Sequence, residues 1–370
     1  MTAKLRIGVM FGGRSGEHEV SLRSARSVIG ALNREVFNIV PIGITLDGKW
    51  VGLQNPEQVL NALKDQETAS LDSLALFAEP GLGNIYKVTR EEALEVFSAF
   101  DVIFPVLHGT FGEDGTMQGL LELADVPYVG AGVLASSVAM DKGLFKSVMR
   151  DTGIPVVKDI VLLSSQIRSD MDGALAEVDR IGGYPVFTKP ANLGSSVGVS
   201  KCTSRADLVE GLLEAAEYDR RVVVEEGLDA REIEVSVLGN ETPEASVPGE
   251  IVPCDAFYSY RAKYIDDDSD LLIPAPIDKS TTDRVKELAV KAYKAIDCAG
   301  MARVDFLLDR NSGALYLNEI NTIPGFTSIS MYPKLWEESG LAYPQLMEKL
   351  VDLAFERYEQ KSALKRKYGA

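Results

Sequence analysis

MARVDFLLDRNSGALYLNEIN, residues 301–321, predicts a β-hairpin. Met301–Leu308 and Ala314–Asn321 are strand-like, and the Asp, Asn, Ser and Gly residues of Asp309–Gly313 between them form a strong turn signal. Side chains alternate between the two faces of a strand, so the register of the hairpin decides which of them meet. A turn centred on Ser312 brings four polar side chains to one face of the sheet.

These polar side chains are two carboxylates, a carboxamide and a guanidinium. In this register Asp305 pairs with Glu319, and Arg303 pairs with Asn321. Mg²⁺ prefers a few carboxylates together with other oxygen ligands, and Mn²⁺ is a possible substitute. A solvent-facing polar face is the alternative, but Leu307 and Leu317 fall on the same face in this register and indicate that the face is partly covered. We therefore predict a metal site of Asp305, Glu319 and Asn321.

Segments on the N-terminal side of the hairpin predict an α/β sheet. Leu5–Phe11 is a short apolar run followed by Gly-Gly, which is typical of a buried strand and a turn. Apolar residues recur at helical spacing over 20–32, and Phe37–Ile44 and Val102–Leu107 predict further strands. Strands that alternate with helices favour a parallel sheet. Residues 47–91 have a weaker pattern, for which we expect variable loops and short helices.

The stretch between that sheet and the C-terminus predicts more elements of both kinds. Helices are expected at 141–151, 205–218 and 281–296, and again at the C-terminus. Strands are expected at 156–163, 186–189, 197–201, 221–225 and 232–238. Residues 255–270 are polar and aromatic without a clear period, which is typical of a long functional or disordered loop.

Composition indicates a globular protein of two or three packed subdomains. The chain has 370 residues, long for a single core, and 46% of them are hydrophobic. Lys and Arg number 38 against 55 Asp and Glu, so the formal net charge is −17. That charge repels phosphate backbones and anionic membrane surfaces, and we expect neither nucleic acid nor membrane as a partner.

Cysteine usage and hydropathy favour a cytoplasmic location. Cys202, Cys254 and Cys298 are odd in number and far apart, so neither a disulfide framework nor a Cys-rich zinc site is expected. The N-terminal residues are too interrupted for a secretory signal, and no run of about 18 apolar residues occurs.

A loop rich in Gly and Ser predicts phosphate binding. Asn192–Gly198 contains two glycines that let the backbone approach a ligand, and successive N–H groups can form an anion-binding nest. Lys189 ends the preceding strand within reach of such a ligand, and a flexible hairpin tip is the alternative. The P-loop pattern is absent. Gly130–Ala135 matches the dinucleotide pattern, but only a brief strand precedes it, so tight packing is the favoured interpretation.

Two strand ends and one polar loop suggest a shared cleft with a cover. Gly12–Ser21, which contains Glu17, and Leu107–Gly115, which contains His108, both follow predicted strands. Without further context Glu17 is equally well interpreted as a helix-capping charge. The loop Phe257–Tyr264 interleaves aromatic and cationic residues; a lid over a ligand is one interpretation and a solvated loop the other.

Taken together, the motifs resemble one enzyme family from about Leu5 to the C-terminal helix. The segments that carry the resemblance are Phe11–Ser21, His108–Gly115, Met140–Lys142, Lys189-Pro190, Gly194–Gly198, Arg303–Asp305 and Asn318–Ser328. The chain resembles the D-alanine–D-alanine ligases of the ATP-grasp superfamily, and Ser330–Trp336 is most similar to their longer bacterial subtype. Thr188 and Arg261 depart from the family pattern but lie outside the motif positions.

The resemblance implies an α/β ATP-grasp fold, α+β in its nucleotide-binding part. It implies three parts: a substrate-binding domain over 1–140, a central subdomain over 141–220, and a C-terminal subdomain over 221–370 with a lid at 255–270. ATP would lie between the last two. The implied nucleotide-binding residues are Lys142, Lys189, Ser196 and Lys263 for the phosphates, Glu225, Glu226, Leu228 and Phe257 for adenine, and Glu232 for ribose.

The implied reaction joins two D-alanine molecules through an acylphosphate for peptidoglycan synthesis. The implied substrate-site residues are Glu17, Ser195 and Tyr264 for the first ammonium and lid closure, Ser330 and Met331 for the second carboxylate, Arg303 and Gly325 for the oxyanion, and His108 in the substrate pocket. The family also implies ATP as substrate, two Mg²⁺ ions and a homodimer. Ligation to D-lactate or D-serine, or a non-catalytic nucleotide-binding module, are the alternatives.

Overall fold

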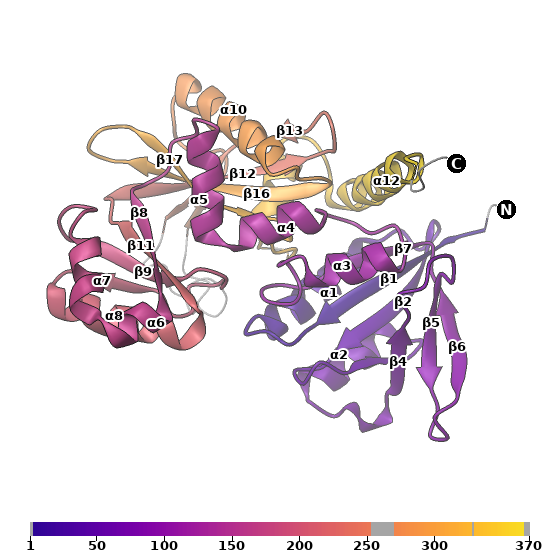
Figure 1. Cartoon of the computed structure of the whole chain (residues 1–370). Helices are drawn as coiled ribbons and strands as arrows, with labels where there is room; N and C mark the ends of the chain where they lie inside the picture. The colour runs from indigo at the N-terminus through magenta and orange to yellow at the C-terminus, as the bar shows by residue number, and fades with distance from the viewer. Residues whose placement is uncertain (1–2, 253–269, 328, 366–370) are drawn as a thin grey trace.

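The computed structural model of the chain describes residues 3–252, 270–327 and 329–365 (Figure 1). Their strands form three β-sheets that follow one another along the chain. The fold is the mixed α/β arrangement that the sequence predicts. The predicted boundary at residue 140 falls between the strands of the first and second sheets, whereas the one at residue 220 lies just before Arg221–Glu226, which is still a strand of the second sheet. As a division into domains, the three predicted parts stay a prediction.

The first sheet has seven strands in the order β6-β5-β4-β3-β2-β1-β7. Its parallel strands are β1 (Leu5–Gly12), β2 (Phe37–Ile44) and β7 (Val102–Val106). Its antiparallel strands are β3 (Trp50–Gly52), β4 (Asp72–Leu76), β5 (Asn84–Val88) and β6 (Leu94–Ala99). The associated helices are α1 (His18–Ala31), α2 (Pro56–Lys64), η1 (Thr68–Ser70) and α3 (Thr116–Leu123).

Two expectations for this region need correction. The sheet is parallel only across β2, β1 and β7. The short helices expected over 47–91 are present as α2 and η1, but the expectation missed the strands β3, β4 and β5 in the same range. These strands are three to five residues long and mostly half-exposed. Strands so short give little room for a period-two pattern, which is why the sequence shows them only weakly.

The second sheet has four strands in the order β10-β9-β11-β8. Its strands are β8 (Asp159–Leu163), β9 (Val186–Pro190), β10 (Ser200–Cys202) and β11 (Arg221–Glu226). The helices that share its core are α6 (Ser164–Ser169), α7 (Met171–Val178) and α8 (Arg205–Tyr218). The Gly/Ser-rich loop that connects β9 to β10 therefore lies at one end of this sheet.

The third sheet carries the hairpin. Its strands are β12 (Ala230–Leu238), β13 (Glu244–Ala245), β14 (Gly249–Val252), β15 (Asp270–Leu272), β16 (Met301–Asp309) and β17 (Leu315–Asn321). The helices α4 (Val133–Met140), α5 (Lys142–Asp151) and α10 (Lys279–Ala295) cover one face of it (Figure 1). Val304, Phe306 and Leu317 point into that apolar layer. The polar residues of the hairpin consequently face the other way.

The two C-terminal helices connect the third sheet to the first. α11 (Met331–Glu338) lies against β12, and α12 (Tyr343–Ser362) contacts α1 and β7. Leu346, Leu350 and Val351 of α12 share one hydrophobic core with Ile7 and Val9 of β1. In Figure 1 the yellow helix α12 accordingly lies beside the indigo N-terminal sheet. Within the described part of the chain, no helix is both long and apolar enough to cross a membrane.

Candidate active site

At the end of the hairpin farthest from the turn, the two strands pair in the predicted register. Arg303 pairs with Asn321 and Asp305 with Glu319, but the register shifts directly after Asp305, so that Leu317 pairs with Phe306. This bulge turns Leu317 into the apolar core, where it is fully buried. Its placement on the polar face was therefore wrong. An extra residue in one strand changes the face of everything beyond it, and the turn sequence does not reveal the insertion.

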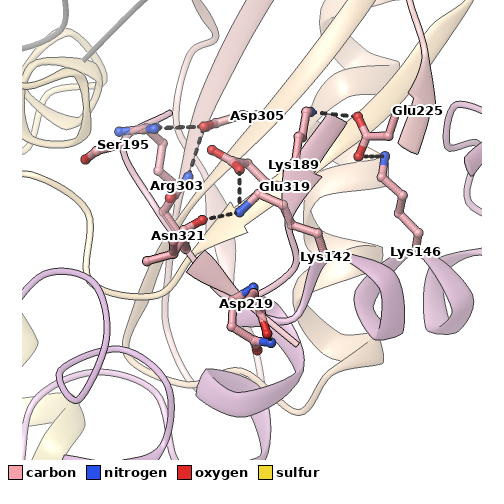
Figure 2. A network of polar contacts seen from close by, with 12 residues as sticks. Lys142, Lys146, Lys189, Ser195, Asp219, Glu225, Arg303, Asp305, Glu319 and Asn321 are labelled. Atoms are coloured by element: carbon pink, nitrogen blue, oxygen red, sulfur yellow. Dashed lines mark hydrogen bonds and ion pairs between the residues drawn. The ribbon is translucent and has the colours of Figure 1, made fainter. Parts of the chain in front are cut away.

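The polar face of the hairpin is held together by close contacts (Figure 2). Arg303 donates from Nε and Nη2 to the two oxygens of Asp305 at 2.8 and 2.7 Å. The amide of Asn321 donates to Asp305 Oδ2 at 2.9 Å. Arg303 Nε also lies 3.0 Å from Glu234 Oε2, and Lys142 Nζ lies 3.8 Å from Glu319 Oε2. The carboxylates are thus compensated by cations from two elements, Arg303 of β16 and Lys142 of α5.

This donor set suits a hard divalent cation. Two carboxylates and one carboxamide supply only oxygen ligands, as Mg²⁺ prefers, and leave positions for phosphate oxygens. Among the described residues there is no cluster of three or more His, Cys, Asp or Glu side chains arranged for a metal. The third proposed ligand is instead the carboxamide of Asn321, which hydrogen-bonds Asp305. Asn321 thus contacts Asp305, and Glu319 is the cross-strand neighbour of Asp305, while ligation of a metal by the three groups stays a prediction.

A cavity of about 920 Å³ opens beside this face. It brings together most of the predicted substrate residues from all three parts of the chain. The predicted residues that line it are Glu17, His108, Lys142, Ser195, Arg303, Glu319, Asn321, Gly325, Ser330 and Met331. Residues far apart in sequence therefore meet at one cavity. Asp305 does not line the cavity itself but contacts two residues that do, Asn321 and Arg303. The other predicted site residues that the structure describes also lie outside the lining: Lys189, Ser196, Glu225, Glu226, Leu228 and Glu232.

Glu17 connects the first sheet to the Gly/Ser-rich loop. Ser195 Oγ donates a hydrogen bond to Glu17 Oε1, as the resemblance implies. A Cβ on Gly194 would lie 2.8 Å from Glu17 Oε2, so this glycine lets the loop backbone approach the carboxylate. Ser195 and Ser196 adopt left-handed backbone conformations with φ of 51° and 60°. Such conformations are uncommon for residues with a Cβ and concentrate at functional sites.

His108 is a buried wall residue of the cavity. Its Nδ1 lies 3.0 Å from the carbonyl oxygen of Ile323, and its Nε2 lies 2.9 Å from Ser24 Oγ. The ring therefore donates from Nδ1 and accepts at Nε2, which is the neutral tautomer. Burial, followed by the charge of Arg303, lowers the pKa of His108 to about 4. Direct contact of this ring with substrate stays a prediction.

The lowered pKa of His108 predicts a pH dependence of folding. Its folded pKa lies below its unfolded value of 6.5, so its contribution is complete above pH 6.5 and is lost as pH falls toward 4. We expect this group to lower the free energy of unfolding by up to about 3 kcal/mol over that range. Urea denaturation at several pH values should show a shallower fall for His108→Gln. A fall in His108→Gln as steep as that of the wild type would refute the assignment.

Gly325 and Ser330 lie together where β17 leads into α11. A Cβ on Gly325 would lie 2.8 Å from Ser330 Oγ, so the absence of a side chain lets the two residues approach closely. Ser330 is the N-cap of α11, and Met331 is its first residue. No side-chain cap hydrogen bond is made there, and Ser330 Oγ instead accepts from the Thr327 backbone N–H at 3.0 Å. Free N–H groups at a helix N-terminus suit a carboxylate.

Glu225 is the most enclosed of the predicted nucleotide residues. Its side chain is 4% exposed, with Oε2 at 2.7 Å from Lys189 Nζ and Oε1 at 3.3 Å from Lys146 Nζ. Burial alone would raise the pKa of Glu225, but the two ammonium groups outweigh it and hold the pKa at about 2. Glu225 is therefore ionised, and in this structure it forms an ion pair with Lys189 (Figure 2).

Other predicted nucleotide residues are half-buried around this ion pair. Lys142 donates from Nζ to the carbonyl oxygen of Leu193 at 2.7 Å, which ties α5 to the Gly/Ser-rich loop. Glu226 accepts from the Lys158 backbone N–H at 2.9 Å. Leu228 and Glu232 are half-buried at the end of the second sheet and in β12. Phe257, Lys263 and Tyr264, and nearly all of the predicted lid at 255–270, lie outside the described residues.

Three site residues escaped the sequence analysis. Lys146 lies among the apolar residues on the buried face of α5, and a charged residue at such a position was the sequence signal that could have identified it. Glu113 lines the cavity and accepts from the Gly109 backbone N–H at 2.6 Å; burial, with the nearby charge of Glu17, raises its pKa. Glu234 alternates with the predicted Glu232 in one strand, but only the third-sheet topology places it beside Arg303.

Comparison with known proteins identifies the same family over the whole chain. Family models described as D-ala D-ala ligase N-terminus and C-terminus match residues 6–131 and 148–352. A D-alanine--D-alanine ligase of Thermoanaerobacter sp. (strain X514) is 50% identical over 361 residues, covering 97% of this chain and 98% of that protein. One from Natranaerobius thermophilus is 46% identical over 359 residues, with 97% of each covered.

Solved structures of the family superimpose over nearly the whole chain. The D-alanine-D-alanine ligase from Coxiella burnetii has a TM-score of 0.82 at 37% identity, covering 97% of this chain and 96% of that one. The VanG D-Ala:D-Ser ligase from Enterococcus faecalis has a TM-score of 0.84 at 36% identity, covering 95% and 100%.

Proposed function

This chain belongs to the D-alanine–D-alanine ligase family, and from that premise we propose how its residues join two D-alanine molecules at the expense of ATP. The observation that carries the proposal is the polar face of the hairpin beside a cavity lined by Glu17, Ser195 and Ser330. The product, D-alanyl-D-alanine, is the dipeptide of peptidoglycan precursors. We place the reaction in the cytoplasm, where ATP is available.

The first step activates a carboxylate that would not otherwise accept an amine. One D-alanine oxygen attacks the γ-phosphorus of ATP, the bond from that phosphorus to the bridging oxygen breaks, and ADP leaves from an acylphosphate. Glu17 binds the ammonium of this D-alanine, and Ser195 orients Glu17. Lys142 and Lys189 contact the phosphates. Such transfer depends on positioning and charge neutralisation more than on covalent help from the protein.

Two Mg²⁺ ions, or Mn²⁺, are the proposed cofactors. Asp305, Glu319 and Asn321 would hold them, and when bound they would neutralise charge on the phosphate oxygens. The oxygen-only donor set of these three side chains supports this assignment. Arg303 moves its guanidinium from Asp305 toward the reacting carbonyl in this scheme, while Glu234 remains as its second carboxylate partner.

The second step forms the peptide bond. The free amine of the second D-alanine attacks the acylphosphate carbon and a tetrahedral oxyanion forms. The carbon–oxygen bond to phosphate then breaks, the nitrogen gives up one proton, and inorganic phosphate leaves as the carbonyl is restored. Arg303 and the Gly325 N–H stabilise the oxyanion. Ser330 and the Met331 N–H at the start of α11 bind the second carboxylate, and His108 forms part of the pocket wall. We propose that Phe257, Lys263 and Tyr264 belong to a lid that excludes water from the acylphosphate.

A coupled assay of ADP release tests this function. ATP and D-alanine should give ADP, phosphate and D-alanyl-D-alanine in equal amounts, and L-alanine should give none. Phosphate release without dipeptide would reject the ligase assignment. Absence of any turnover would favour the alternative of a non-catalytic nucleotide-binding module.

D-serine is the second acceptor to test, because the VanG D-Ala:D-Ser ligase is a structural neighbour at 36% identity. The more similar curated relatives, at 46% and 50%, are D-alanine--D-alanine ligases, so D-alanine is the favoured acceptor. Mixtures of D-alanine with D-serine or D-lactate, analysed for product, separate the three possibilities. We also propose a homodimer, which light scattering after size-exclusion chromatography tests.

The Ser195–Glu17 contact should couple ATP use to dipeptide formation. Ser195→Ala removes the hydroxyl that orients Glu17, so the first D-alanine is held less well and more acylphosphate is lost to water. We expect kcat/KM for D-alanine to fall roughly 10- to 100-fold and the ratio of dipeptide to ADP to fall below one.

The matched control for this variant is Ser200→Ala. Ser200 Oγ donates to Glu214 Oε2 at 2.7 Å, which is also a serine–glutamate pair but lies away from the cavity. Its removal should leave both kinetic values unchanged. If Ser195→Ala behaves like Ser200→Ala, Ser195 has no role in coupling.

A further inference from the structure

Lys146 carries a charge where the fold does not need one. It lies in α5 on the face that packs with Phe145 and Met149, and its side chain is 0% exposed. Its ammonium nitrogen has no hydrogen-bond partner within the described part of the chain. Its one ion pair among those residues is with Glu225, at 3.3 Å. Burial lowers the pKa of Lys146, because desolvation disfavours its charged form, so a lysine at this position costs the fold a desolvation penalty that an apolar side chain would not.

The two lysines on Glu225 differ in their surroundings. Lys146 contacts Oε1 from within the core, whereas Lys189 contacts Oε2 from β9 with a side chain that is 16% exposed. The shorter and better directed contact is the one to Lys189, at 2.7 Å. Of the two lysines that flank Glu225 in Figure 2, only Lys189 has solvent-accessible side-chain surface, so its contact with Glu225 is the one that can exchange when a ligand binds.

Movement of Lys189 away from Glu225 would leave a buried negative charge, which Lys146 still compensates. If Lys189 moves to the phosphates of ATP, it leaves a carboxylate that is 4% exposed. A buried carboxylate without a cation becomes protonated or retains its lysine. With Lys146 in place, one positive and one negative charge remain, and the carboxylate stays ionised.

We propose that Lys146 is a positioning residue that keeps Glu225 ionised and fixed while Lys189 moves to the phosphates. The ionised carboxylate then accepts a hydrogen bond from the exocyclic amine of adenine, and a base with an oxo group at that position is rejected. Lys146 thereby determines nucleotide specificity without touching the nucleotide. This inference rests on the proposed function, in which Glu225 faces adenine and Lys189 contacts phosphate.

The test compares ATP with inosine triphosphate, which carries an oxo group in place of the adenine amine. Lys146→Met preserves the length and apolar packing of the side chain and removes the charge. We expect kcat/KM for ATP to fall roughly 10- to 100-fold, the value for inosine triphosphate to fall less than about 3-fold, and the KM for D-alanine to stay unchanged. An equal fall for both nucleotides would overturn the inference, because general damage to the fold does not distinguish them.

Lys158→Met is the matched control. Lys158 forms an ion pair of 3.8 Å with Glu226, the residue that follows Glu225 in the sequence, but the Lys158 side chain is 69% exposed. The Lys158→Met variant should therefore retain the wild-type preference for ATP. If Lys146→Met does not fold, Lys146→Gln takes its place with the same expected loss of preference, and an unchanged preference there overturns the inference.

The wild-type protein separates this inference from the function on which it rests. No dipeptide from ATP and D-alanine rejects the proposed function itself. Dipeptide formation without any preference for ATP rejects the contact between Glu225 and adenine, and the role of Lys146 with it. Dipeptide formation with a preference that survives in both Lys146 variants rejects the inference alone.

Discussion

The variant Glu319→Ala should fold normally and lose ATP turnover by a factor on the order of 10³ or more. Glu319 is half-buried, and its described ion pair with Lys142 is a loose one of 3.8 Å, so its removal costs the fold little. It is also one of only two carboxylates in the proposed metal site. Thermal unfolding and ADP release measure the two effects separately, and Mn²⁺ binding in the presence of ADP reports on the metal without catalysis.

Glu338→Ala is the control for this prediction. Glu338 is an exposed residue at the end of α11, away from the cavity, and its variant should bind Mn²⁺ and turn over ATP as the wild type does. Wild-type Mn²⁺ affinity in Glu319→Ala would remove Glu319 from the metal site, whatever the activity of the variant.

Replacement of Arg303 by Met should damage both folding and catalysis. The Arg303 side chain is 19% exposed and compensates Glu234 and Asp305, which are 7% and 11% exposed. Two nearly buried carboxylates would then lack their cation, at a cost of about 3–5 kcal/mol in the free energy of unfolding. Loss of the oxyanion contact should lower kcat by a further factor of roughly 10²–10³. Urea denaturation and dipeptide formation are the measurements.

Two further variants separate the contributions of Arg303. Arg231→Met breaks a comparable pair in the same sheet, with Glu250 at 2.8 and 2.6 Å, and should cost stability but leave kcat unchanged. Adding Glu234→Gln to Arg303→Met should restore part of the stability and none of the activity, because it removes a stranded charge and supplies no cation. Recovered activity in that double variant would contradict the catalytic role of Arg303.

The hairpin shows how far the sequence alone could predict this protein. Alternation in the two strands and the turn signal between them placed Arg303 opposite Asn321 and Asp305 opposite Glu319, as the structure confirms. Local rules suffice there because the partners are close in sequence. Helix 205–218, which the structure also confirms, follows from equally local apolar spacing.

Contacts between distant parts of the chain were accessible only through the family resemblance or not at all. Ser195 and Glu17 meet across 178 residues, and no periodicity within either segment indicates that contact. Lys146 was missed because the apolar stripe of α5 predicts an apolar side chain at that position, and its partner Glu225 comes from another sheet. The bulge after Asp305 was missed because the hairpin sequence does not reveal the inserted residue.

The position of α12 has a consequence for biosynthesis. The leucines and valine of this late helix belong to the same apolar core as β1, the first strand that the ribosome releases. The earliest sheet therefore cannot complete its interior until translation is almost finished, and its exposed apolar surface must stay protected from aggregation throughout that interval. Because α12 also contacts α1, whose N-cap is Glu17, the packing behind this wall of the cavity is complete only once α12 has been made.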